Sequence, residues 1–382
     1  MSKGKMQGSQ ALQPLISHAE LMSAKRILFM SHLALGDFVY HGPYLAALKA
    51  NYPHLELDIW FDDNKNRSKG WKSERNEALT ERIKDSGIAT VIFPVAGSND
   101  ERQKLIRRGN RRQYDIIFYF SANRSLQFAK LAKQIASTAI IVGNTPPKAW
   151  LNLREYAYYR HVKRKFVLDE VTGKRELVTH IFDRCRERYE RCFGPLKLHN
   201  THKQGLPVNT TEKSRGVISA WISQQVSDHS SPLVLLNPFS GSQKQDLSAE
   251  AFTSVINAIF THYEQAHIIV NVPASSEIGV KAVLKAHELN QNSQISLFTQ
   301  SDNIHLLPAL LQQVDFIVTV ESAITHFAST LHCPQLAIVR ENAASRRPIE
   351  YVDLFWCPER IHNVRGIELA PKVISAMRSL KL

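Results

Sequence analysis

Residues 26–53, RILFMSHLALGDFVYHGPYLAALKANYP, form the stretch that decides the expected fold. Its first part, Arg26–Ser31, is mostly apolar and predicts a buried strand. The turn His32–Asp37 comes next, followed by a helical run over residues 38–51 that Pro53 ends. A strand, a tight turn and a helix in succession are typical of a parallel sheet with helices on its faces.

The same unit recurs along the rest of the chain. Short apolar runs predict strands at residues 55–61, 90–93, 114–120, 139–142, 233–237, 267–272, 295–298, 315–320 and 335–339. Helices are predicted between them, at residues 79–86, 100–112, 124–136, 248–262, 275–290 and 304–313, and the polar segment 62–76 predicts a loop. This alternation predicts an α/β fold with doubly wound parallel sheets.

The chain of 382 residues is long enough for two domains, each with its own core. The expected divisions are a tail or extra helix at 1–24, a first domain at 25–200, a linker at 201–231, a second domain at 232–365 and a closing helix at 366–382. Ligands of open parallel sheets bind beyond the carboxyl ends of the strands. Two such domains are therefore expected to share a cleft.

Charge is divided unevenly between the two halves. Residues 1–200 hold 34 basic and 20 acidic side chains, whereas residues 201–382 hold 14 and 15, and the whole chain has a formal net charge of +13. The excess predicts that the first half meets an anionic partner: nucleic acid, a membrane surface or a phosphorylated ligand. A solvated basic face is the other interpretation. No nucleic-acid-binding signature accompanies the charge, which weighs against nucleic acid.

The remaining composition favours the cytoplasm. The four cysteines, Cys185, Cys192, Cys333 and Cys357, form no CxxC pair and match no zinc spacing. No stretch approaches the roughly 18 apolar residues of a membrane span, and the opening MSKGKMQGSQ lacks the apolar centre of a signal peptide. If the protein acts at a membrane, we expect it to do so from the surface.

Three loops that follow predicted strands carry the candidate chemistry. In the first, Gly36 allows a tight turn close to a ligand, and Asp37 either caps the following helix or accepts a proton from a hydroxyl nucleophile. In the second, NPFSGSQK at 237–244, the hydroxyls and N–H groups of Ser240, Gly241 and Ser242 suit a phosphate. Lys244 would there neutralise a departing diphosphate.

The third loop follows the predicted strand DFIVTV at 315–320. Glu321 and Ser322 fall at a helix N-terminus, and His326 lies near the start of that helix. A Ser-His-acid hydrolase would use the same residue types, but no GxSxG motif accompanies them, so we discount it.

Together the three loops resemble the lipopolysaccharide heptosyltransferase family, glycosyltransferase family nine. The resemblance rests on the opening stretch with ALGD at 34–37, on NPFSGSQKQDLSAEAF at 237–252 and on LPALLQQVDFIVTVESAITHFAS at 307–329. Weaker matches are FSANRS at 120–125, Val142-Gly143 and PASSE at 273–277. The similarity covers roughly residues 26–340, and the motifs are specific in combination rather than singly.

The resemblance implies a GT-B fold, in which two Rossmann-like domains face a central cleft. It also implies an inverting transfer from a nucleotide sugar, usually ADP-heptose, without a metal or other cofactor. By that likeness Asp37 is the general base, and the donor contacts are Ser240, Gly241, Ser242, Lys244, Glu277, Glu321, Ser322, Ala323 and His326. Glu321 stands where the family typically has Asp, and Ala323 where it has Gly, which bears on the donor rather than on the reaction.

The expected acceptor is the phosphorylated inner core of lipopolysaccharide, at the inner face of a Gram-negative inner membrane, where a cationic first half would dock. Its expected contacts in the cleft are Gly36, Lys65, Arg67, Lys69, Lys72 and Arg124; each of the cations can also be a solvated surface charge. Two alternatives remain open: transfer of another nucleotide-activated sugar, and a non-catalytic protein that binds a nucleotide sugar or a polyanion.

Overall fold

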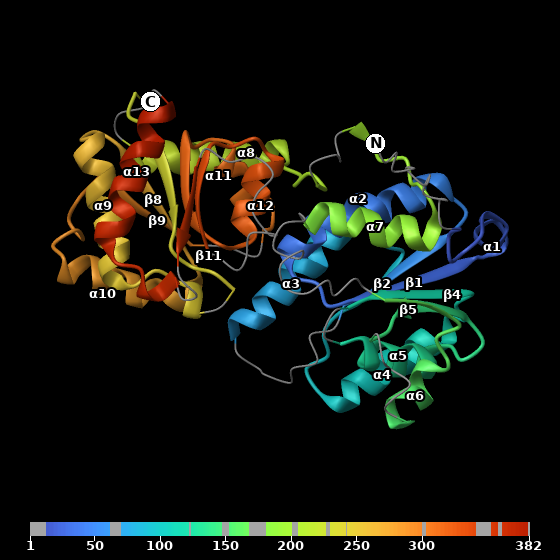
Figure 1. The fold of residues 1–382 in the computed structure, drawn as a ribbon. Helices are drawn as coiled ribbons and strands as arrows, with labels where there is room; N and C mark the ends of the chain where they lie inside the picture. The colour runs from blue at the N-terminus through green and yellow to red at the C-terminus, as the bar shows by residue number, and fades with distance from the viewer. Residues whose placement is uncertain are drawn as a thin grey trace, which may run out of the picture.

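The fold is taken from a computed structural model of the chain (Figure 1). It describes residues 13–61, 70–121, 124–146, 153–167, 181–200, 205–226, 230–241, 243–299, 303–340, 353–357 and 361–380. Within these ranges, no helix is both long and apolar enough to cross a membrane.

The first half is built on a parallel sheet of six strands. In chain order these are β1 (Arg26–Ser31), β2 (Glu56–Phe61), β3 (Val91–Phe93), β4 (Ile116–Phe120), β5 (Ile140–Asn144) and β6 (Arg164–Phe166). Their spatial order is β3-β2-β1-β4-β5-β6. The first strand is central, with Ile27 paired to Leu57 on one side and to Ile116 on the other. Both faces of β1 are buried, because helices cover the sheet on both sides.

Each face of this sheet has its own group of helices (Figure 1). One face packs on α1 (His18–Ser23), α2 (Leu35–Asn51), α3 (Gly70–Asp85) and α7 (Ile181–Phe193). The other packs on α4 (Asn99–Arg111), α5 (Ser125–Ile135) and α6 (Leu153–Tyr159).

The second half repeats the topology. Its strands are β7 (Leu233–Asn237), β8 (His267–Val272), β9 (Ile295–Thr299), β10 (Phe316–Val320), β11 (Gln335–Arg340) and β12 (Asp353–Cys357). The order β12-β11-β10-β7-β8-β9 again places the first strand between the second and the fourth. In both sheets the chain therefore reverses direction across the sheet at this point, where α/β folds bind ligands.

The helices of the second half also form two layers. The outer face carries α9 (Ala249–His262), α10 (Glu277–Ala286) and α13 (Gly366–Leu380). The face toward the first half carries α8 (Glu212–Gln225), α11 (Leu306–Leu311) and α12 (Ala323–Thr330) (Figure 1). One apolar cluster continues from Val39 and Tyr40 of α2 to Phe327 and Ala328 of α12. The two halves thus meet through packed side chains on this side.

The predicted α/β architecture with two facing parallel sheets is confirmed, with local corrections. Helix α3 begins at Gly70, inside the segment 62–76 predicted as a loop, and α8 occupies residues 212–225 of the expected linker. Helix α8 packs on α11, so this part of the chain is structural. Strands β6 and β12 were not predicted; β6 has only three residues, two of them basic, and no apolar run marks it.

The close packing of β5 on β4 gives a stability prediction. A Cβ added at Gly143 would lie 2.2 Å from the ring of Tyr119, its neighbour on β4. Gly143→Ala should therefore destabilise the fold by about 1–3 kcal/mol, as overpacked cores do. In the matched variant Gly216→Ala, on α8, the new methyl would meet no described atom within 4 Å, and a gain of about 0.4–1 kcal/mol is expected. Urea unfolding of both variants checks this; equal stabilities would contradict the β4–β5 packing.

Candidate active site

The turn after β1 and the helix after β10 meet where the two halves face each other. A Cβ built on Gly36, in the first turn of α2, would lie 2.6 Å from Cδ2 of His326 on α12. Only a residue without a side chain allows the backbone of α2 to come this close to the His326 ring. The turn that holds Asp37 therefore lies against the N-terminal part of α12.

Asp37 does not occupy the N-cap position itself. Ala34 is the N-cap of α2, and the Asp37 carboxylate, in the first turn, accepts a hydrogen bond from the backbone N–H of Ala34 at 3.0 Å. This bond also explains why the helix begins at Leu35 rather than at Phe38. It leaves Asp37 partly exposed, with the carboxylate fixed by the backbone.

Tyr40 joins the two halves one helical turn after Asp37. Its hydroxyl lies 2.6 Å from Nδ1 of His326, and the two rings meet edge to face with centroids 5.1 Å apart. Burial, and then the charge of Asp37, raise the pKa of the Tyr40 hydroxyl, so Tyr40 remains neutral. The pair fixes the His326 ring over Gly36.

Removing the Tyr40 hydroxyl should loosen this junction. Tyr40→Phe leaves Nδ1 of the buried His326 without the hydroxyl it now meets, and an unsatisfied buried polar atom costs about 1–3 kcal/mol. We expect a lower Tm for Tyr40→Phe in thermal unfolding. Tyr263→Phe, a partly buried tyrosine in the second half, is the control, and a Tyr40→Phe variant as stable as this control would show that the bond contributes nothing.

A buried polar network ties together the ends of the central strands in the second half. The amide nitrogen of Asn237 donates to Thr319 Oγ1 at 3.0 Å and to Ser322 Oγ at 3.2 Å. Its Oδ1 accepts from the Asn271 amide at 2.9 Å, and Oδ1 of Asn271 is buried with no partner among the described residues. Ser322 also caps α12 by accepting from the Ile324 N–H. The network orients the N-terminus of α12.

Sequence reasoning did not single out Tyr40, Asn237, Asn271 or Thr319. A signal existed for the two asparagines, because each interrupts an apolar run at the end of a strand, LVLLN and HIIVNV. No such signal existed for Tyr40, whose partner is 286 residues away.

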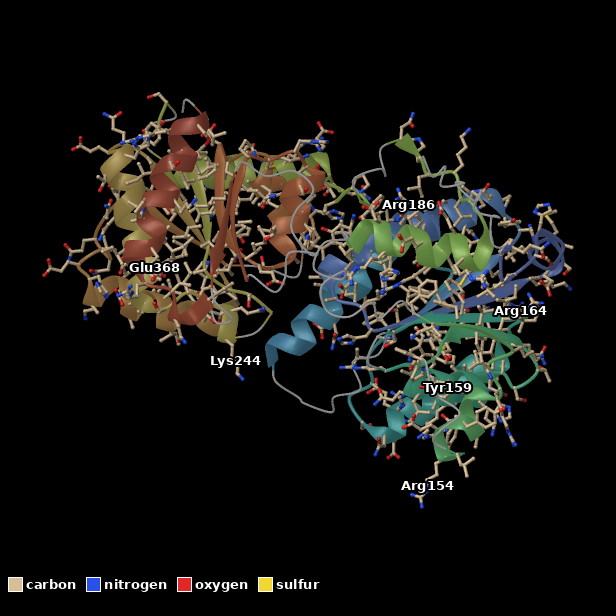
Figure 2. All side chains as sticks on the ribbon, in the orientation of Figure 1. Arg154, Tyr159, Arg164, Arg186, Lys244 and Glu368 are labelled. Carbon is tan, nitrogen blue, oxygen red and sulfur yellow. The ribbon has the colours of Figure 1, made fainter. Side chains whose placement is uncertain are left out.

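The loop after β7 is closed by its own side chains. The backbone N–H of Ser240 donates to Oδ1 of Asp246 at 2.7 Å, and its hydroxyl lies 3.3 Å from Oε1 of Gln245. The Ser240 N–H, which the sequence predicted to bind a phosphate, is thus bonded to the Asp246 carboxylate. Gly241 and Lys244 are exposed, and Figure 2 shows Lys244 extending away from the ribbon. Ser242 lies outside the described residues.

The other donor contacts predicted in the second half lie on different elements. Glu277 begins α10, where Lys281 lies 2.5 Å from it and Thr299 donates to it at 3.3 Å. The hydrogen bond and charge of Lys281, and then Thr299, lower the pKa of the Glu277 carboxyl. The backbone N–H of Glu321 donates to Ile338, and Ala323 is the first residue of α12.

One of the predicted acceptor cations is seen beside the first loop. The Arg124 guanidinium lies 3.2 Å from Nδ1 of His32, which directly follows β1. Lys65, Arg67 and Lys69 lie outside the described residues, as does the side chain of Lys72, whose backbone belongs to α3.

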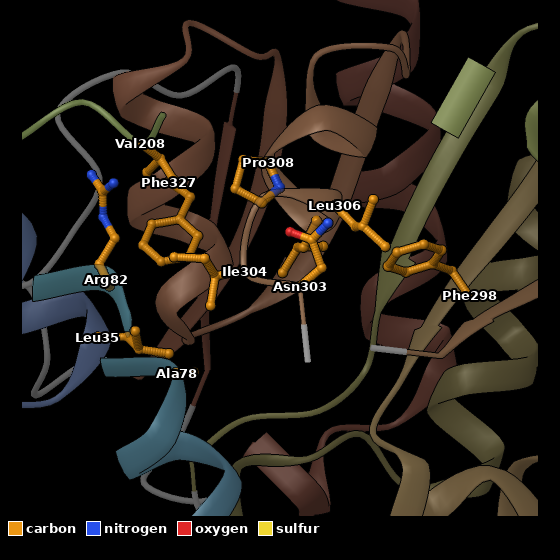
Figure 3. Close-up of a pocket in the computed structure, with 11 residues that line it drawn as sticks. Leu35, Ala78, Arg82, Val208, Phe298, Asn303, Ile304, Leu306, Pro308 and Phe327 are labelled. Atoms are coloured by element: carbon orange, nitrogen blue, oxygen red, sulfur yellow. The ribbon is translucent and has the colours of Figure 1, made fainter. Parts of the chain in front are cut away.

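An apolar pocket borders these loops between the halves (Figure 3). Leu35 and Phe327, the chain neighbours of Gly36 and His326, both line it. Its other lining residues come from α3, α11 and the chain around them: Ala78, Arg82, Val208, Phe298, Asn303, Ile304, Leu306, Leu307 and Pro308. The Arg82 guanidinium is engaged by Asp85 at 3.1 Å and by the Pro207 carbonyl, so the pocket is apolar despite this charge.

Comparison with solved structures identifies the architecture. A glycosyl transferase family 9 protein from Veillonella parvula DSM 2008 matches with a TM-score of 0.67 over 94% of this chain and 98% of that chain, at 16% identity. The chain has the fold of the heptosyltransferases. E. coli ADP-heptose LPS heptosyltransferase II matches with a TM-score of 0.63 over 94% and 100%, at 14% identity. E. coli heptosyltransferase WaaC with ADP matches with a TM-score of 0.59 over 92% and 99%, at 13% identity.

Sequence comparison matches a smaller part of the chain than comparison of structures does. The curated relative is "Putative lipopolysaccharide heptosyltransferase 4" from E. coli K12, 22% identical over 189 residues. The match spans 50% of this chain and 46% of that relative, so it covers about half the length of each. No family model matches the chain.

Proposed function

We propose that the chain is an inverting glycosyltransferase that moves a heptose from ADP-heptose to the phosphorylated inner core of lipopolysaccharide. The observation that carries the proposal is the contact of the Gly36–Asp37 turn with His326 of α12. It supports a carboxylate of the first half and a helix N-terminus of the second half acting on the same cleft.

In the proposed reaction the Asp37 carboxylate takes the proton of the acceptor hydroxyl, whose oxygen attacks the anomeric carbon. The bond from that carbon to the donor diphosphate breaks, and the electron pair leaves with the diphosphate. The N-terminus of α12, held by Ser322 and Asn237, presents a positive dipole end where this charge grows. Lys244 supplies a further positive charge once the loop after β7 turns toward the donor. The reaction proposed here needs no metal ion.

The geometry of the loop after β7 constrains how the donor diphosphate binds. The Asp246 carboxylate occupies the Ser240 N–H and would repel a diphosphate that approached the same group. Donor binding is therefore expected to displace Asp246 from Ser240. The pocket lined by Leu35 and Phe327 is mostly apolar and offers few hydrogen-bonding groups to water, which favours transfer to the acceptor over hydrolysis of the donor.

The charge of the first half supports an anionic acceptor at a membrane. Residues 1–200 carry a net +14, from 34 basic and 20 acidic side chains, and inner-core phosphates and anionic lipids both attract such a surface. We place the protein at the inner face of the inner membrane, bound peripherally.

A second candidate function is transfer of a different activated sugar. Glu321 and Ala323 add a methylene and a methyl to the positions where the resemblance expects Asp and Gly, and Ala323 is the first residue of α12. Added bulk at the start of this helix would change the space available to the donor sugar.

Thermal unfolding with a panel of nucleotide sugars separates the candidates. A donor present at 100 times its Kd stabilises the folded state by about 2.7 kcal/mol. ADP-heptose is expected to raise the Tm more than ADP-glucose, UDP-glucose or GDP-mannose. A larger shift with one of these donors would favour the second candidate. A shift only with a polyanion such as heparin would contradict both and leave a non-catalytic binder.

A further inference from the structure

Helix α6 exposes apolar side chains at the end of the first half. Leu153 is 81% exposed and Tyr156 is 44% exposed, whereas Tyr159, the last residue of the same helix, is buried. Tyr159 accounts for the anchoring of α6, since it belongs to the core under α5. The exposure of Leu153 and Tyr156 has no such structural explanation.

Cations surround these two side chains. Residues 153–167 contain five basic side chains and one acidic one, and residues 124–138 of the neighbouring α5 region contain three basic and no acidic ones. Lys165 Nζ lies 5.8 Å from the Tyr156 ring centroid, and Lys130 Nζ lies 4.4 Å from that of Tyr158. Arg154, at the start of α6, extends into solvent at the tip of the first half (Figure 2).

The surroundings of α6 are positive as well as apolar. Desolvation first, and then the charges of Lys133 and Arg160, lower the pKa of the His161 imidazole just after the helix. Helices α4, α5 and α6 form one layer on the face of the sheet opposite α2 and α7, and α6 lies at its outer end (Figure 1). A flat surface can therefore reach α6 without meeting the second half of the chain.

We propose that this surface docks the protein on an anionic lipid bilayer. The α6 patch consists of two apolar residues and six cations: Leu153, Tyr156, Lys130, Lys133, Arg154, Arg160, Lys163 and Lys165. Leu153 and the Tyr156 ring enter the boundary between headgroups and acyl chains, and the cations meet lipid phosphates. Tyrosine suits this boundary because its ring is apolar and its hydroxyl polar.

The combination of side chains favours a bilayer over the other polyanions. Nucleic acid would be met by the cations but offers nothing to an aliphatic side chain as exposed as Leu153. A bilayer accepts both classes of side chain at once. The proposal adds a docking surface to the proposed function, whose acceptor is held in a membrane, but the binding itself requires neither donor nor transfer.

Vesicle co-sedimentation of the full chain tests the α6 patch. Vesicles of equal parts phosphatidylcholine and phosphatidylglycerol are compared with vesicles of phosphatidylcholine alone. Each cation near an anionic surface contributes about fivefold to partitioning, so Arg154→Glu/Lys165→Glu should weaken binding about 25-fold or more. Leu153→Ala/Tyr156→Ala should weaken it about tenfold, and part of that loss should persist in high salt.

Matched variants in the second half control for net charge and for exposed apolar area. Lys213→Glu/Lys372→Glu changes the charge by the same amount, and Ile367→Ala removes a side chain that is 74% exposed; both should bind vesicles as the wild type does. Equal losses in patch and control variants would overturn the proposal. So would unchanged binding of the patch variants, equal binding to both kinds of vesicle, or binding to heparin without binding to vesicles.

The Tm shift with nucleotide sugars, measured on the same proteins, keeps the two proposals apart. Patch variants should retain the full donor shift. A chain that binds anionic vesicles but no nucleotide sugar would refute the proposed function and leave the α6 patch standing. The reverse result would refute the patch alone.

Discussion

Asp37→Asn is expected to lower kcat about 10²–10⁴-fold, the usual contribution of a general base. The amide still accepts a hydrogen bond from the Ala34 N–H, so the first turn of α2 should keep its geometry. It cannot take the proton of an acceptor hydroxyl. Turnover should therefore fall while the donor-induced Tm shift stays unchanged.

Asp115→Asn is a matched control for this change. Its carboxylate also accepts backbone hydrogen bonds, from Lys25 and Arg26, but at the amino end of the first sheet, away from the cleft. Asp115→Asn should leave kcat near the wild-type value. If Asp37→Asn kept wild-type turnover, the Asp37 carboxylate would only stabilise the first turn of α2, and another group would have to serve as base.

Gly36→Ala should lower kcat/KM about 100-fold. The added methyl would lie 2.6 Å from the His326 ring, closer than such atoms approach, so the ring or the helix must move. Because His326 is held by Tyr40 on the same helix as Asp37, the movement separates Asp37 from the N-terminus of α12. A displacement of about 1 Å between reacting groups can lower a rate by about 10².

Gly279→Ala provides the comparison for Gly36→Ala. Gly279 lies on α10, and a Cβ there would meet no described atom within 4 Å. Its kcat/KM should match the wild type, and steady-state kinetics of both variants tests this. Wild-type kcat/KM in Gly36→Ala would mean that the two halves do not meet at this point in the working protein.

The sequence predicted those parts of the fold that local patterns determine. Apolar runs bounded by turns located the central strands of both sheets, and the strand-end rule selected the loops that hold Asp37, Ser240 and Glu321. The second part of helix α3 was predicted at 79–86, but its beginning was not, because the sequence from Gly70 is polar on average and lacks the apolar face that marks a buried helix. Helix α8 was not predicted, because the polar stretch that precedes it, with its Gly and Pro residues, favoured a linker.

The contacts across the cleft depend on tertiary packing, and no local sequence pattern predicts them. The sequence marks Gly36 as a tight turn, but not that the His326 ring of the other half fills the space beside it. Likewise, the loop around Ser240 has the residue types of a phosphate-binding loop. The Ser240 N–H nevertheless donates to the carboxylate of Asp246, six residues further along the chain. Both facts require the loop conformation, which sequence spacing does not supply.

The most direct measurement is the transfer itself. The full chain is incubated with ADP-heptose and a lipopolysaccharide core that ends before the added heptose, and the acceptor is then analysed by mass spectrometry and NMR. The expected product carries one additional heptose, with the anomeric configuration opposite to that of the donor. An acceptor of unchanged mass, under conditions where ADP-heptose raises the Tm, would contradict glycosyl transfer across this cleft.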